Sequence, residues 1–350
     1  MIKFGIVGCG RVGKVHAAAV YETKGSLLTA ICDLEEGKLK TLTKEFRVSN
    51  VYKNYTEMLE NKDIDVINIC TPNGLHADMA IAAIKKGKHV IIEKPMATSL
   101  EDARLIIETA KKYNVKATVV HQNRFNEAIQ VTREALLKGR FGKLSYGTAS
   151  VRWTRTQDYY NQDDWRGTKE MLDGVLMNQV IHTIDLLIWL MGPVKSVFGR
   201  AVTRLREIEM EDVGTAILEF ESGSIAVVDG TGTIYPVDIG ANINLFGECG
   251  TVSIGGNAAN QIERWRFSES FEKEEQEMIE SNKAMPLSVY GNGHKQIVEN
   301  FVESIKENKD PYVSLEAGFN AVKVILAIYK SSMSGQPVYF ENEVVSSGIK

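Results

Sequence analysis

Three polar side chains lie at helical spacing in an otherwise apolar segment, Gly174–Met191. Asn178, His182 and Asp185 are four and three residues apart, which places them on one face of a helix. Buried polar groups cost free energy unless they form hydrogen bonds, and a histidine among them can exchange protons near neutral pH. The segment is therefore a candidate for acid–base chemistry. The alternative is a core histidine that hydrogen-bonds Asp185.

Two further polar clusters directly follow apolar, strand-like segments. They are Thr71-Pro72-Asn73-Gly74-Leu75-His76 and Glu93-Lys94-Pro95. Ligands of open α/β sheets bind beyond the carboxyl ends of the strands, so both clusters are candidate site segments. Pro95 favours an extended conformation at Lys94, which allows this lysine to point into a cleft. An ordinary surface charge is the alternative for Lys94.

A glycine-rich turn, Gly8-Cys9-Gly10-Arg11-Val12-Gly13, follows the first apolar segment. The first glycine permits a tight turn, the second lets a pyrophosphate approach the backbone, and the third lets helix and strand pack closely. Asp33 closes the second strand-like segment, where a carboxylate can bind both ribose hydroxyls and would repel a 2′-phosphate. The following Leu34-Glu35-Glu36 offers that phosphate no cation. We expect NAD as the cofactor.

Short apolar strands alternate with helical segments in the first part of the chain, a pattern typical of βαβ units and a parallel sheet. Strands are predicted at Ile2–Val7, Leu27–Cys32, Val66–Cys70, His89–Ile92 and Ala117–His121. Helices are predicted at Val12–Glu22, Lys38–Phe46, Asn54–Asn61, Ala77–Lys85 and Leu100–Tyr113. We expect a doubly wound Rossmann domain over residues 1–122.

Longer runs of alternating polar and apolar residues follow Asn123, as in a sheet with one solvated face. They are Leu144–Arg155, Val197–Leu205, Gly214–Glu221, Ser224–Ile234 and Ala241–Gly247. The charged stretch Phe271–Asn282 is expected at the surface. Gly291–Lys306 and Ala317–Ser332 are predicted to be closing helices that could pack back on the first domain. Residues 123–350 should therefore form the second, α+β domain of an α/β protein, with a large, mainly antiparallel open sheet.

Composition excludes several classes of protein. The chain has 350 residues and a net charge of −4, so it can form two cores and has no basic field for nucleic acid. The four cysteines lack C-x-x-C spacing, so we expect no metal site and thiols in a reducing cytoplasm. The N-terminus lacks a signal-peptide pattern, so we expect the chain to stay where it is made. Gly174–Met191 carries polar residues and ends at Gly192-Pro193, which favours a core helix over a membrane span.

The sequence resembles the Gfo/Idh/MocA oxidoreductases over nearly its whole length. The matching motifs are Gly8–Gly13 with Asp33, Thr71-Pro72-Asn73 with His76, Glu93-Lys94-Pro95, and Asn178-x-x-x-His182-x-x-Asp185. The resemblance implies that Lys94 and His182 are catalytic and that the sheet domain builds the substrate site and a homodimer or homotetramer interface. It also implies a set of cofactor-binding residues: Gly8, Gly10, Arg11, Val12, Gly13, Asp33, Thr71, Pro72, Asn73, His76, Glu93 and Lys94. Many members carry aspartate where this chain has Asn178. Because asparagine cannot take a proton, we expect Asn178 to hold a sugar hydroxyl instead.

A narrower resemblance is to the branch of the family that oxidises UDP-N-acetylglucosamine or its uronate at the 3-hydroxyl. Its motifs are Arg155-x-x-Asp158-Tyr159-Tyr160, Trp165-Arg166-Gly167-Thr168, Leu176-Met177-Asn178-Gln179 and Tyr290-Gly291-x-Gly293-His294. Tyr160 and Trp165 offer faces to a sugar or base, and Arg155 and Arg166 can pair with phosphate or carboxylate. A packed loop over the sheet is the alternative. Lys94, Asn178 and His182 complete the expected substrate site.

These features predict an NAD-dependent dehydrogenase that takes hydride from a secondary hydroxyl of a sugar or nucleotide sugar, with the proton leaving to Lys94 and His182. Oxidation of a free polyol such as inositol is the nearest alternative. A glycoside hydrolase that uses NAD transiently, and a regulatory protein that binds NAD without turnover, are more distant ones. Membrane and nucleic-acid partners are not expected.

Overall fold

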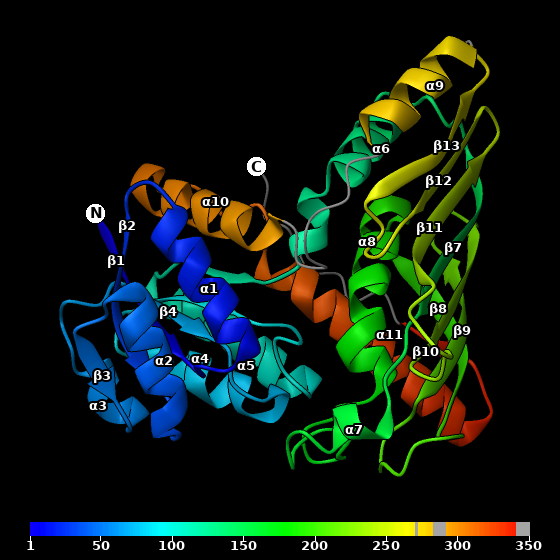
Figure 1. The fold of residues 1–350 in the computed structure, drawn as a ribbon. Helices are drawn as coiled ribbons and strands as arrows, with labels where there is room; N and C mark the ends of the chain where they lie inside the picture. Colours follow the sequence, from blue (N-terminus) through cyan, green and yellow to red (C-terminus); the bar gives the residue numbers. More distant parts are fainter. Residues whose placement is uncertain (270–271, 283–291, 341–350) are drawn as a thin grey trace.

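The computed structural model describes residues 1–269, 272–282 and 292–340. Two sheets dominate these residues, one of six strands and one of eight, and they lie side by side in Figure 1. The expected α/β fold, a Rossmann sheet followed by an α+β part with a large open sheet, is confirmed. Phe271, Tyr290 and Gly291, which belong to sequence predictions above, lie outside the described residues.

The first sheet is parallel and has the strand order β3-β2-β1-β4-β5-β6. Its strands are β1 (Ile2–Val7), β2 (Ser26–Cys32), β3 (Asn50–Tyr52), β4 (Val66–Ile69), β5 (His89–Ile92) and β6 (Ala117–Val119). The helices between them are α1 (Arg11–Glu22), α2 (Glu36–Phe46), α3 (Tyr55–Leu59), α4 (His76–Lys85) and α5 (Leu100–Tyr113), with a 3-10 turn η1 (Asn73–Leu75) before α4. The order reverses between β1 and β4, which is where ligands of such sheets bind. The three-residue β3 was not predicted.

The second sheet has the order β13-β12-β11-β7-β10-β9-β8-β14. Its strands are β7 (Leu144–Arg152), β8 (Val194–Val202), β9 (Val213–Phe220), β10 (Ile225–Thr231), β11 (Gly240–Gly247), β12 (Gly250–Gly255), β13 (Gln261–Phe267) and β14 (Val338–Tyr339). Neighbouring strands are antiparallel except β7 and β10, which run parallel. The sheet is thus mixed, although mainly antiparallel as expected.

The remaining helices differ from the sequence prediction at several places. They are η2 (Gln122–Phe125), α6 (Glu127–Leu137), α7 (Gln157–Tyr160), η3 (Leu176–Val180), α8 (Ile181–Met191), α9 (Glu272–Ser281), α10 (Gly293–Glu307) and α11 (Leu315–Ser334). The segment expected as one helix over Gly174–Met191 begins with a π-helical turn, η3, before α8. The charged stretch expected only at the surface forms α9, in which Glu275 is buried and pairs with Arg266 at 2.7 Å.

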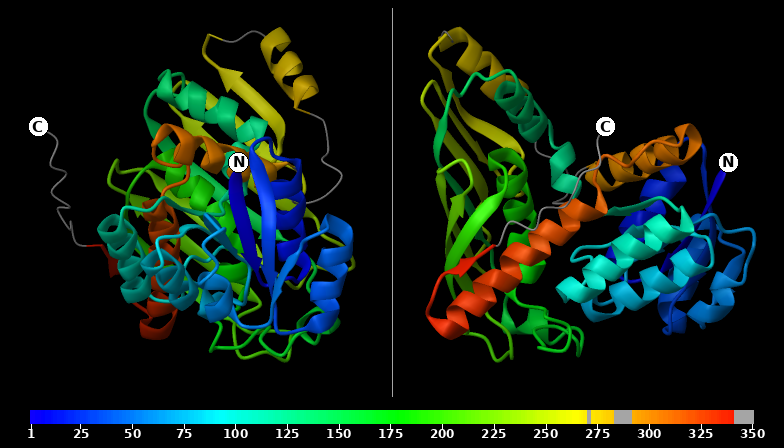
Figure 2. Two further views of the ribbon diagram at one scale, coloured as in Figure 1. Left: turned by 90° about the vertical axis from the view of Figure 1, so that its left-hand side faces the viewer. Right: turned by 180° about the vertical axis from the view of Figure 1, so that it is seen from behind.

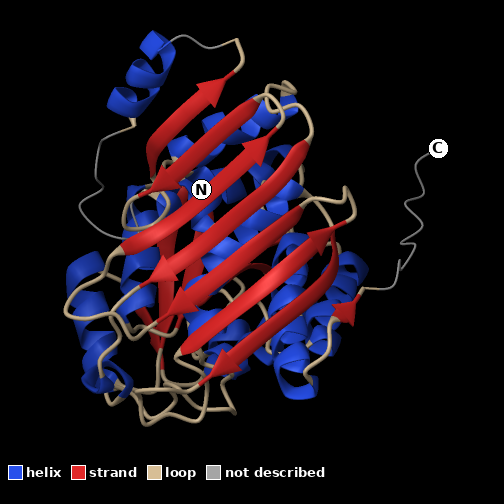
Figure 3. Cartoon of the chain, turned by 90° about the vertical axis from the view of Figure 1, so that its right-hand side faces the viewer, coloured by secondary structure: helices blue, strands red, loops and turns tan. Residues whose placement is uncertain are grey.

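Helices cover one face of the eight-stranded sheet and leave the other open. In Figure 3 the open face is turned to the viewer and the helices lie behind it. The burial pattern of β9 alternates from residue to residue, as expected for a sheet with one covered face. No helix within the described residues has the length and apolar character needed to cross a membrane. The four cysteines are unpaired.

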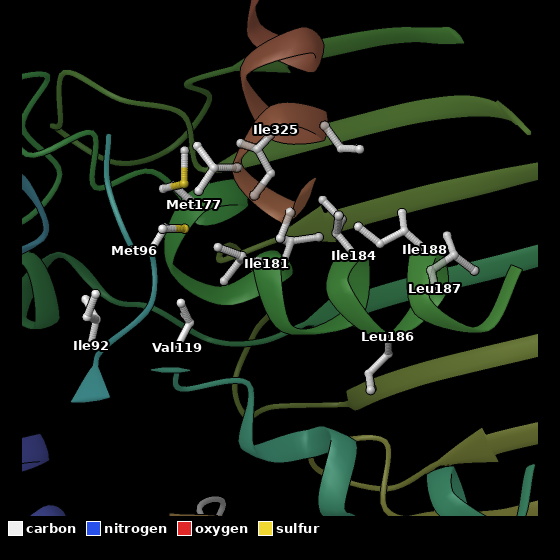
Figure 4. Close-up of a cluster of buried hydrophobic side chains, with 14 of the residues drawn as sticks. Ile92, Met96, Val119, Met177, Ile181, Ile184, Leu186, Leu187, Ile188 and Ile325 are labelled. Carbon is white, nitrogen blue, oxygen red and sulfur yellow. The ribbon is translucent and has the colours of Figure 1, made fainter. Parts of the chain in front are cut away.

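A continuous hydrophobic core joins the two sheets. Figure 4 shows Ile92 and Val119, from the ends of β5 and β6, in one cluster of buried side chains with Met177 of η3 and Ile181 of α8. The buried side chain of Ile325 on α11 belongs to the same cluster. Each large apolar side chain buried in this way contributes about 1.5–3 kcal/mol. The core therefore fixes the end of β5 relative to the start of α8.

The helix α10 returns to the first sheet, as Figures 1 and 2 show. Its apolar residues Ile297, Val298 and Phe301 are buried in one cluster with Phe4 of β1 and Val20 of α1. The C-terminal part of the chain thus contributes to the packing of the N-terminal sheet, and it carries His294 to the interior beside β5.

Candidate active site

The turn between β1 and α1 requires glycine at two positions. Gly8 has φ +87°, and a Cβ atom there would lie 2.5 Å from the carbonyl oxygen of Cys70. A Cβ atom at Gly13 would lie 1.9 Å from the carbonyl oxygen of Gly8, so this glycine permits close contact of helix and strand. At Gly10 no atom of the described residues lies within 4 Å of the position that a Cβ would take. The backbone there is open to a ligand, and a pyrophosphate would meet the first N–H groups of α1, which starts with Arg11 and Val12.

Asp33 follows β2 and lies beside the glycine turn. One carboxylate oxygen accepts a hydrogen bond from the N–H of Cys9 at 2.6 Å, and the other accepts one from the N–H of Glu35 at 2.8 Å. The half-buried carboxylate is therefore held at the carboxyl edge of the sheet. The ammonium of Lys38, which lies close enough to interact electrostatically with Asp33, contacts Glu35 at 2.5 Å. The position of Asp33 fits a contact with the cofactor ribose.

His76 connects the two polar clusters that follow β4 and β5. Its Nε2 atom lies 2.7 Å from the carbonyl oxygen of Thr71, and its Nδ1 atom lies 2.7 Å from that of Pro95. Asn73 is buried in the same loop, after Pro72, and its side-chain Nδ2 has no hydrogen-bond partner within the described residues. A buried amide donor without a partner is costly, so Asn73 fits a residue that serves a bound ligand. The two clusters meet at one edge of the sheet.

Lys94 reaches from the end of β5 to the second half of the chain. Its Nζ atom donates to the backbone oxygen of Asn178 at 2.9 Å and to the side-chain oxygen of Asn178 at 3.0 Å. Burial lowers the pKa of Lys94, and the nearby Arg166 and Arg155 lower it further. Glu93 and Asp173 act in the opposite direction. The pKa of this lysine thus moves toward the range in which an amine can exchange a proton near neutral pH.

Asn178 bridges Lys94 to a buried carboxylate. Its side-chain nitrogen donates to Oδ1 of Asp173 at 2.5 Å. The other oxygen of Asp173 accepts the N–H of Gly167 at 2.9 Å, and burial raises the pKa of Asp173. The amide that was expected to hold a sugar hydroxyl is therefore already engaged at both ends by protein groups.

His182 lies in the first turn of α8 and is half-buried. Its Nδ1 atom is buried and has no hydrogen-bond partner within the described residues. Burial holds the pKa of His182 well below its ordinary value, and the cation of Lys94 and the ring of His121 act in the same direction. The imidazole is therefore neutral at physiological pH and can accept a proton.

Asp185 is bound to an arginine instead of to His182. Its carboxylate accepts two hydrogen bonds from Arg124 of η2, at 2.8 and 2.7 Å, and the pair is buried. His121 lies beside this pair, with Nδ1 3.7 Å from Asp185. Burial lowers the pKa of His121 to about 4, and neither ring nitrogen has a hydrogen-bond partner in the described part of the chain. The alternative of a core histidine bonded to Asp185 is thus wrong for His182. The partner of Asp185 comes from a distant segment that spacing within one helix cannot reveal.

The carboxylate of Glu93 lies in a buried cluster, and its Oε2 atom accepts the backbone N–H of Lys94 at 3.1 Å. Its Oε1 atom accepts from Nε2 of His16 at 2.9 Å and lies 3.3 Å from Nε2 of His294. Burial would raise the pKa of Glu93, but these hydrogen bonds hold it well below the ordinary range. The nitrogen of Asn68 contacts Nδ1 of His16 at 2.9 Å, which assigns the proton of that ring to Nε2. The potential ligand atoms of His16, Glu93 and His294 lie within 4.8 Å of one another, but they already satisfy each other by hydrogen bonds.

Arginine and aromatic side chains gather on the segment that follows β7. Arg166 donates to Asp163 at 2.9 Å and to the hydroxyl of Tyr159 at 2.8 Å, and its guanidinium lies over Trp165 at 4.6 Å. Arg155 lies 4.9 Å from the ring of Trp153. Tyr160 is 5% exposed, and its hydroxyl has no hydrogen-bond partner among the described residues. Arg155 and Arg166 both lower the pKa of Lys94 electrostatically.

Several residues of this region were not singled out in the sequence. They are Asp173, His121, Arg124, Asn68 and His16. His121 could have been found, because it ends a predicted strand next to the one that precedes Lys94. Asp173 and Arg124 carry no local signal, since their partners come from other segments of the chain.

The glycine turn fits NAD, and Lys94 contacts the segment that leads into the helix of His182. These features define the class of protein, an NAD-dependent oxidoreductase. The chain belongs to the Gfo/Idh/MocA family. Residues 2–121 match the model of the oxidoreductase family with NAD-binding Rossmann fold, and residues 133–340 match that of its C-terminal alpha/beta domain.

Solved structures and characterised relatives agree on the class of reaction but differ in substrate. The WlbA dehydrogenases of Bordetella pertussis and Chromobacterium violaceum, each in complex with NADH and UDP-GlcNAcA, are 33% and 34% identical to the chain, with TM-scores of 0.88 and 0.89. The alignments cover 97% and 98% of this chain and 99% and 96% of theirs. The myo-inositol 2-dehydrogenase of Thermotoga maritima is 25% identical over 98% of this chain and 100% of its own length.

Proposed function

We propose that the protein oxidises a secondary hydroxyl, at C3, of a UDP-linked N-acetylated sugar or its uronate, with NAD as hydride acceptor. The contact between Lys94 and Asn178 carries this proposal, because it brings the strand end of an NAD-binding sheet to the helix of His182. The similarity to two WlbA dehydrogenases over nearly the whole chain supports the nucleotide-sugar substrate. The first domain, residues 1–122, would bind the cofactor, and residues 123–350 the substrate.

The residues around the glycine turn fit NAD. Gly8, Gly10, Arg11, Val12 and Gly13 would hold the pyrophosphate, and Asp33 the ribose. The loop Thr71-Pro72-Asn73 and His76 would border the nicotinamide half, with Asn73 offering its unbonded amide nitrogen. Bound NAD+ supplies the acceptor for the hydride that leaves the sugar carbon.

Lys94 and His182 would handle the proton of the reacting hydroxyl. Oxidation of the alcohol releases a hydride from carbon and a proton from oxygen, leaving a ketone. Lys94 uses two hydrogen bonds on Asn178, so a third N–H direction remains for the substrate oxygen. His182 is neutral and has a buried nitrogen without a partner in the described part of the chain, so it can accept the proton. Glu93, whose Oε1 atom is bound by His16, would position Lys94, because its Oε2 atom accepts the backbone N–H of Lys94.

Arg155, Tyr160, Trp165 and Arg166 would form the substrate side of the cleft. A diphosphate or a sugar carboxylate needs cations, and the two guanidinium groups are near enough to Lys94 to lower its pKa electrostatically. Trp165 and the buried Tyr160 would contact the sugar or the base.

A free polyol such as inositol is the second candidate substrate. The 25% identity to the scyllo-inositol 2-dehydrogenase (NAD(+)) of Bacillus subtilis, over 99% of both chains, favours it. A panel of UDP-sugars and inositols, followed by the absorbance of NADH, tests the proposal. Turnover of inositol without turnover of any UDP-sugar would replace it by the polyol reaction. Failure of every compound would revive a regulatory, NAD-binding protein. Turnover of a glycoside without net NADH would indicate a hydrolase.

The open face of the eight-stranded sheet would form a homodimer or homotetramer interface. Phe198 of β8 and Ile217 of β9 lie directly opposite each other there and are 48% and 50% exposed. Apolar side chains of this size in one row favour burial against another surface. We also propose a reducing, cytoplasmic location, because the four cysteines are unpaired.

A further inference from the structure

Asp173 is a buried carboxylate that no cation of the described residues contacts directly. It is 1% exposed, and among the described residues it forms no ion pair with a lysine, arginine or histidine. Its two oxygens instead accept from the amide nitrogen of Asn178 and from the backbone N–H of Gly167. A buried carboxylate costs free energy that a neutral side chain would avoid, so its presence at this position points to a function.

The amide of Asn178 can satisfy its surroundings in one orientation only. Lys94 offers only donors, and ionised Asp173 offers only acceptors. With its oxygen toward Lys94 and its nitrogen toward Asp173, the amide matches both neighbours. A flipped amide would set NH₂ against the ammonium and oxygen against the carboxylate. The charge of Asp173 therefore fixes which atom Lys94 meets.

The second oxygen of Asp173 ties this arrangement to the arginine-bearing segment. Gly167 directly follows Arg166, has φ +70°, and donates its N–H to Asp173 at 2.9 Å. The same carboxylate is thus connected to Lys94 through one amide and to the backbone beside Arg166 through another.

We propose that Asp173 is a positioning residue: acting through Asn178, it orients the ammonium of Lys94 and couples that orientation to the segment that carries Arg166. The proposal rests on the function of Lys94 proposed above. Asp173 itself touches neither substrate nor cofactor in this arrangement. Removing its negative charge also removes an influence that raises the pKa of Lys94.

A swap of the two side chains tests this directly. In Asp173→Asn the new amide must turn an NH₂ toward one of two N–H donors, so one hydrogen bond is lost. In Asn178→Asp two carboxylates face each other. In the double variant Asp173→Asn/Asn178→Asp, every hydrogen bond can form again. The new carboxylate at position 178 accepts from Lys94 and from the new amide nitrogen at position 173, whose oxygen accepts from Gly167. The net charge equals that of the parent.

Turnover with the best substrate of the panel is the first measurement. We expect Asp173→Asn to lower kcat on the order of 100-fold with an unchanged affinity for NAD, and the double variant to recover most of that loss. Thermal unfolding of all variants separates this from a folding defect. Unchanged kcat in Asp173→Asn, or a folded double variant no more active than the single ones, would overturn the proposal.

Chemical labelling of Lys94 gives a readout that needs no substrate. The rate of amine acetylation at Lys94, followed by mass spectrometry across pH, reports the pKa of that lysine. Asp173→Asn should shift the midpoint to lower pH, and the double variant should return it to the parent value or above. The exposed Lys112 serves as internal control and should not move. An unmoved Lys94 midpoint refutes the role of Asp173, whereas a shifted midpoint in a protein without turnover refutes only the proposed reaction.

Discussion

Lys94 and Asn178 are 84 residues apart in the chain, and two hydrogen bonds from one ammonium group join them, at 2.9 and 3.0 Å. This contact connects the carboxyl edge of the Rossmann sheet to the π-helical turn that leads into α8. It brings a side chain of the NAD-binding part to the segment that leads into the helix of His182, and under the proposed function both side chains would meet the reacting hydroxyl.

Replacing Lys94 by Met should abolish turnover. The variant removes the donor for the reacting hydroxyl and leaves the glycine turn and Asp33 unchanged, so NAD should bind with nearly the parent affinity. Steady-state rates and NAD titration by fluorescence measure the two effects separately. Lys112→Met, an exposed change on α5, is the control and should behave as the parent. Substantial turnover in Lys94→Met would disprove the assignment.

Asp33→Ala should weaken the binding of NAD. It should also reduce the difference in affinity between NAD and NADP. The carboxylate is the group that can hold ribose hydroxyls and repel a 2′-phosphate, and hydrogen bonds to charged groups contribute about 1.5–3 kcal/mol. We expect the Kd for NAD to rise at least about 10-fold. Glu101→Ala, an exposed change on α5, is the control and should leave both values unchanged. Parent-like affinity and preference in Asp33→Ala would mean that the carboxylate serves only the turn, through Cys9 and Glu35.

Much of the cofactor half could be predicted because its signals are local. A strand, a glycine turn and a helix follow one another within the first 22 residues, and Lys94 directly follows an apolar strand. The shape of the candidate site could not be predicted, because it depends on contacts between distant segments. Arg124 binds Asp185, and His16 and His294 contact Glu93. Asp173 accepts a hydrogen bond from the amide of Asn178.

Helical spacing in η3 and α8 shows the same limit. The rule of 3.6 residues per turn places Asn178, His182 and Asp185 on one face, but a π-helical turn is wider and changes that phase. The strands β12 and β13 were also not predicted, although polar and apolar residues alternate in them. β13 is an edge strand of the sheet, and β12 is its neighbour.

His121 should make the protein less stable in mild acid. Its pKa is about 4 in the folded protein because of burial, against an ordinary value of 6.5 in the unfolded chain. Between these pH values the unfolded state binds a proton that the folded state does not bind. The free energy of unfolding therefore falls as pH decreases from about 6.5 to about 4. At the lower limit this one group costs on the order of 3 kcal/mol.

His121→Gln should remove that part of the pH dependence. Urea unfolding at three pH values, about 7, 5.5 and 4.5, gives the slope for parent and variant, so a constant loss of stability at all three values does not disturb the comparison. His89→Gln, at a half-buried ring on β5 whose pKa burial also lowers, is the comparison variant and should change the slope less than His121→Gln. Equal slopes for the parent and His121→Gln would contradict a buried, neutral His121.

Ile217→Lys should dissociate the proposed oligomer. The side chain stands opposite Phe198 on the open sheet face, and a charge in a buried apolar interface is not tolerated without a partner. Sedimentation velocity of the variant should show a monomer at micromolar concentration where the parent is a dimer or tetramer. Leu34→Lys, 86% exposed beside Asp33, is the control for an added charge and should leave the mass unchanged. A monomeric parent would disprove the interface.

Arg166→Gln should separate nucleotide sugars from free polyols. A charge-assisted hydrogen bond to phosphate or carboxylate contributes about 1.5–3 kcal/mol, so the KM for a UDP-sugar should rise about 10- to 100-fold. The oxidation of inositol, if the protein catalyses it, needs no such contact. Arg166 also binds Asp163 and Tyr159, and the change could disturb the segment itself.

Asp163→Asn controls for that disturbance, because it removes the partner carboxylate and keeps the guanidinium. It should lower the KM or leave it unchanged, since it frees the cation for the substrate. A second control, Arg152→Gln, removes an exposed guanidinium that pairs with Asp229 at 2.9 Å. Equal KM values for UDP-sugars in Arg166→Gln and the parent would show that the guanidinium stack on Trp165 is only part of a packed loop. The diphosphate would then have to be held elsewhere, with Arg155 as the next cation to change.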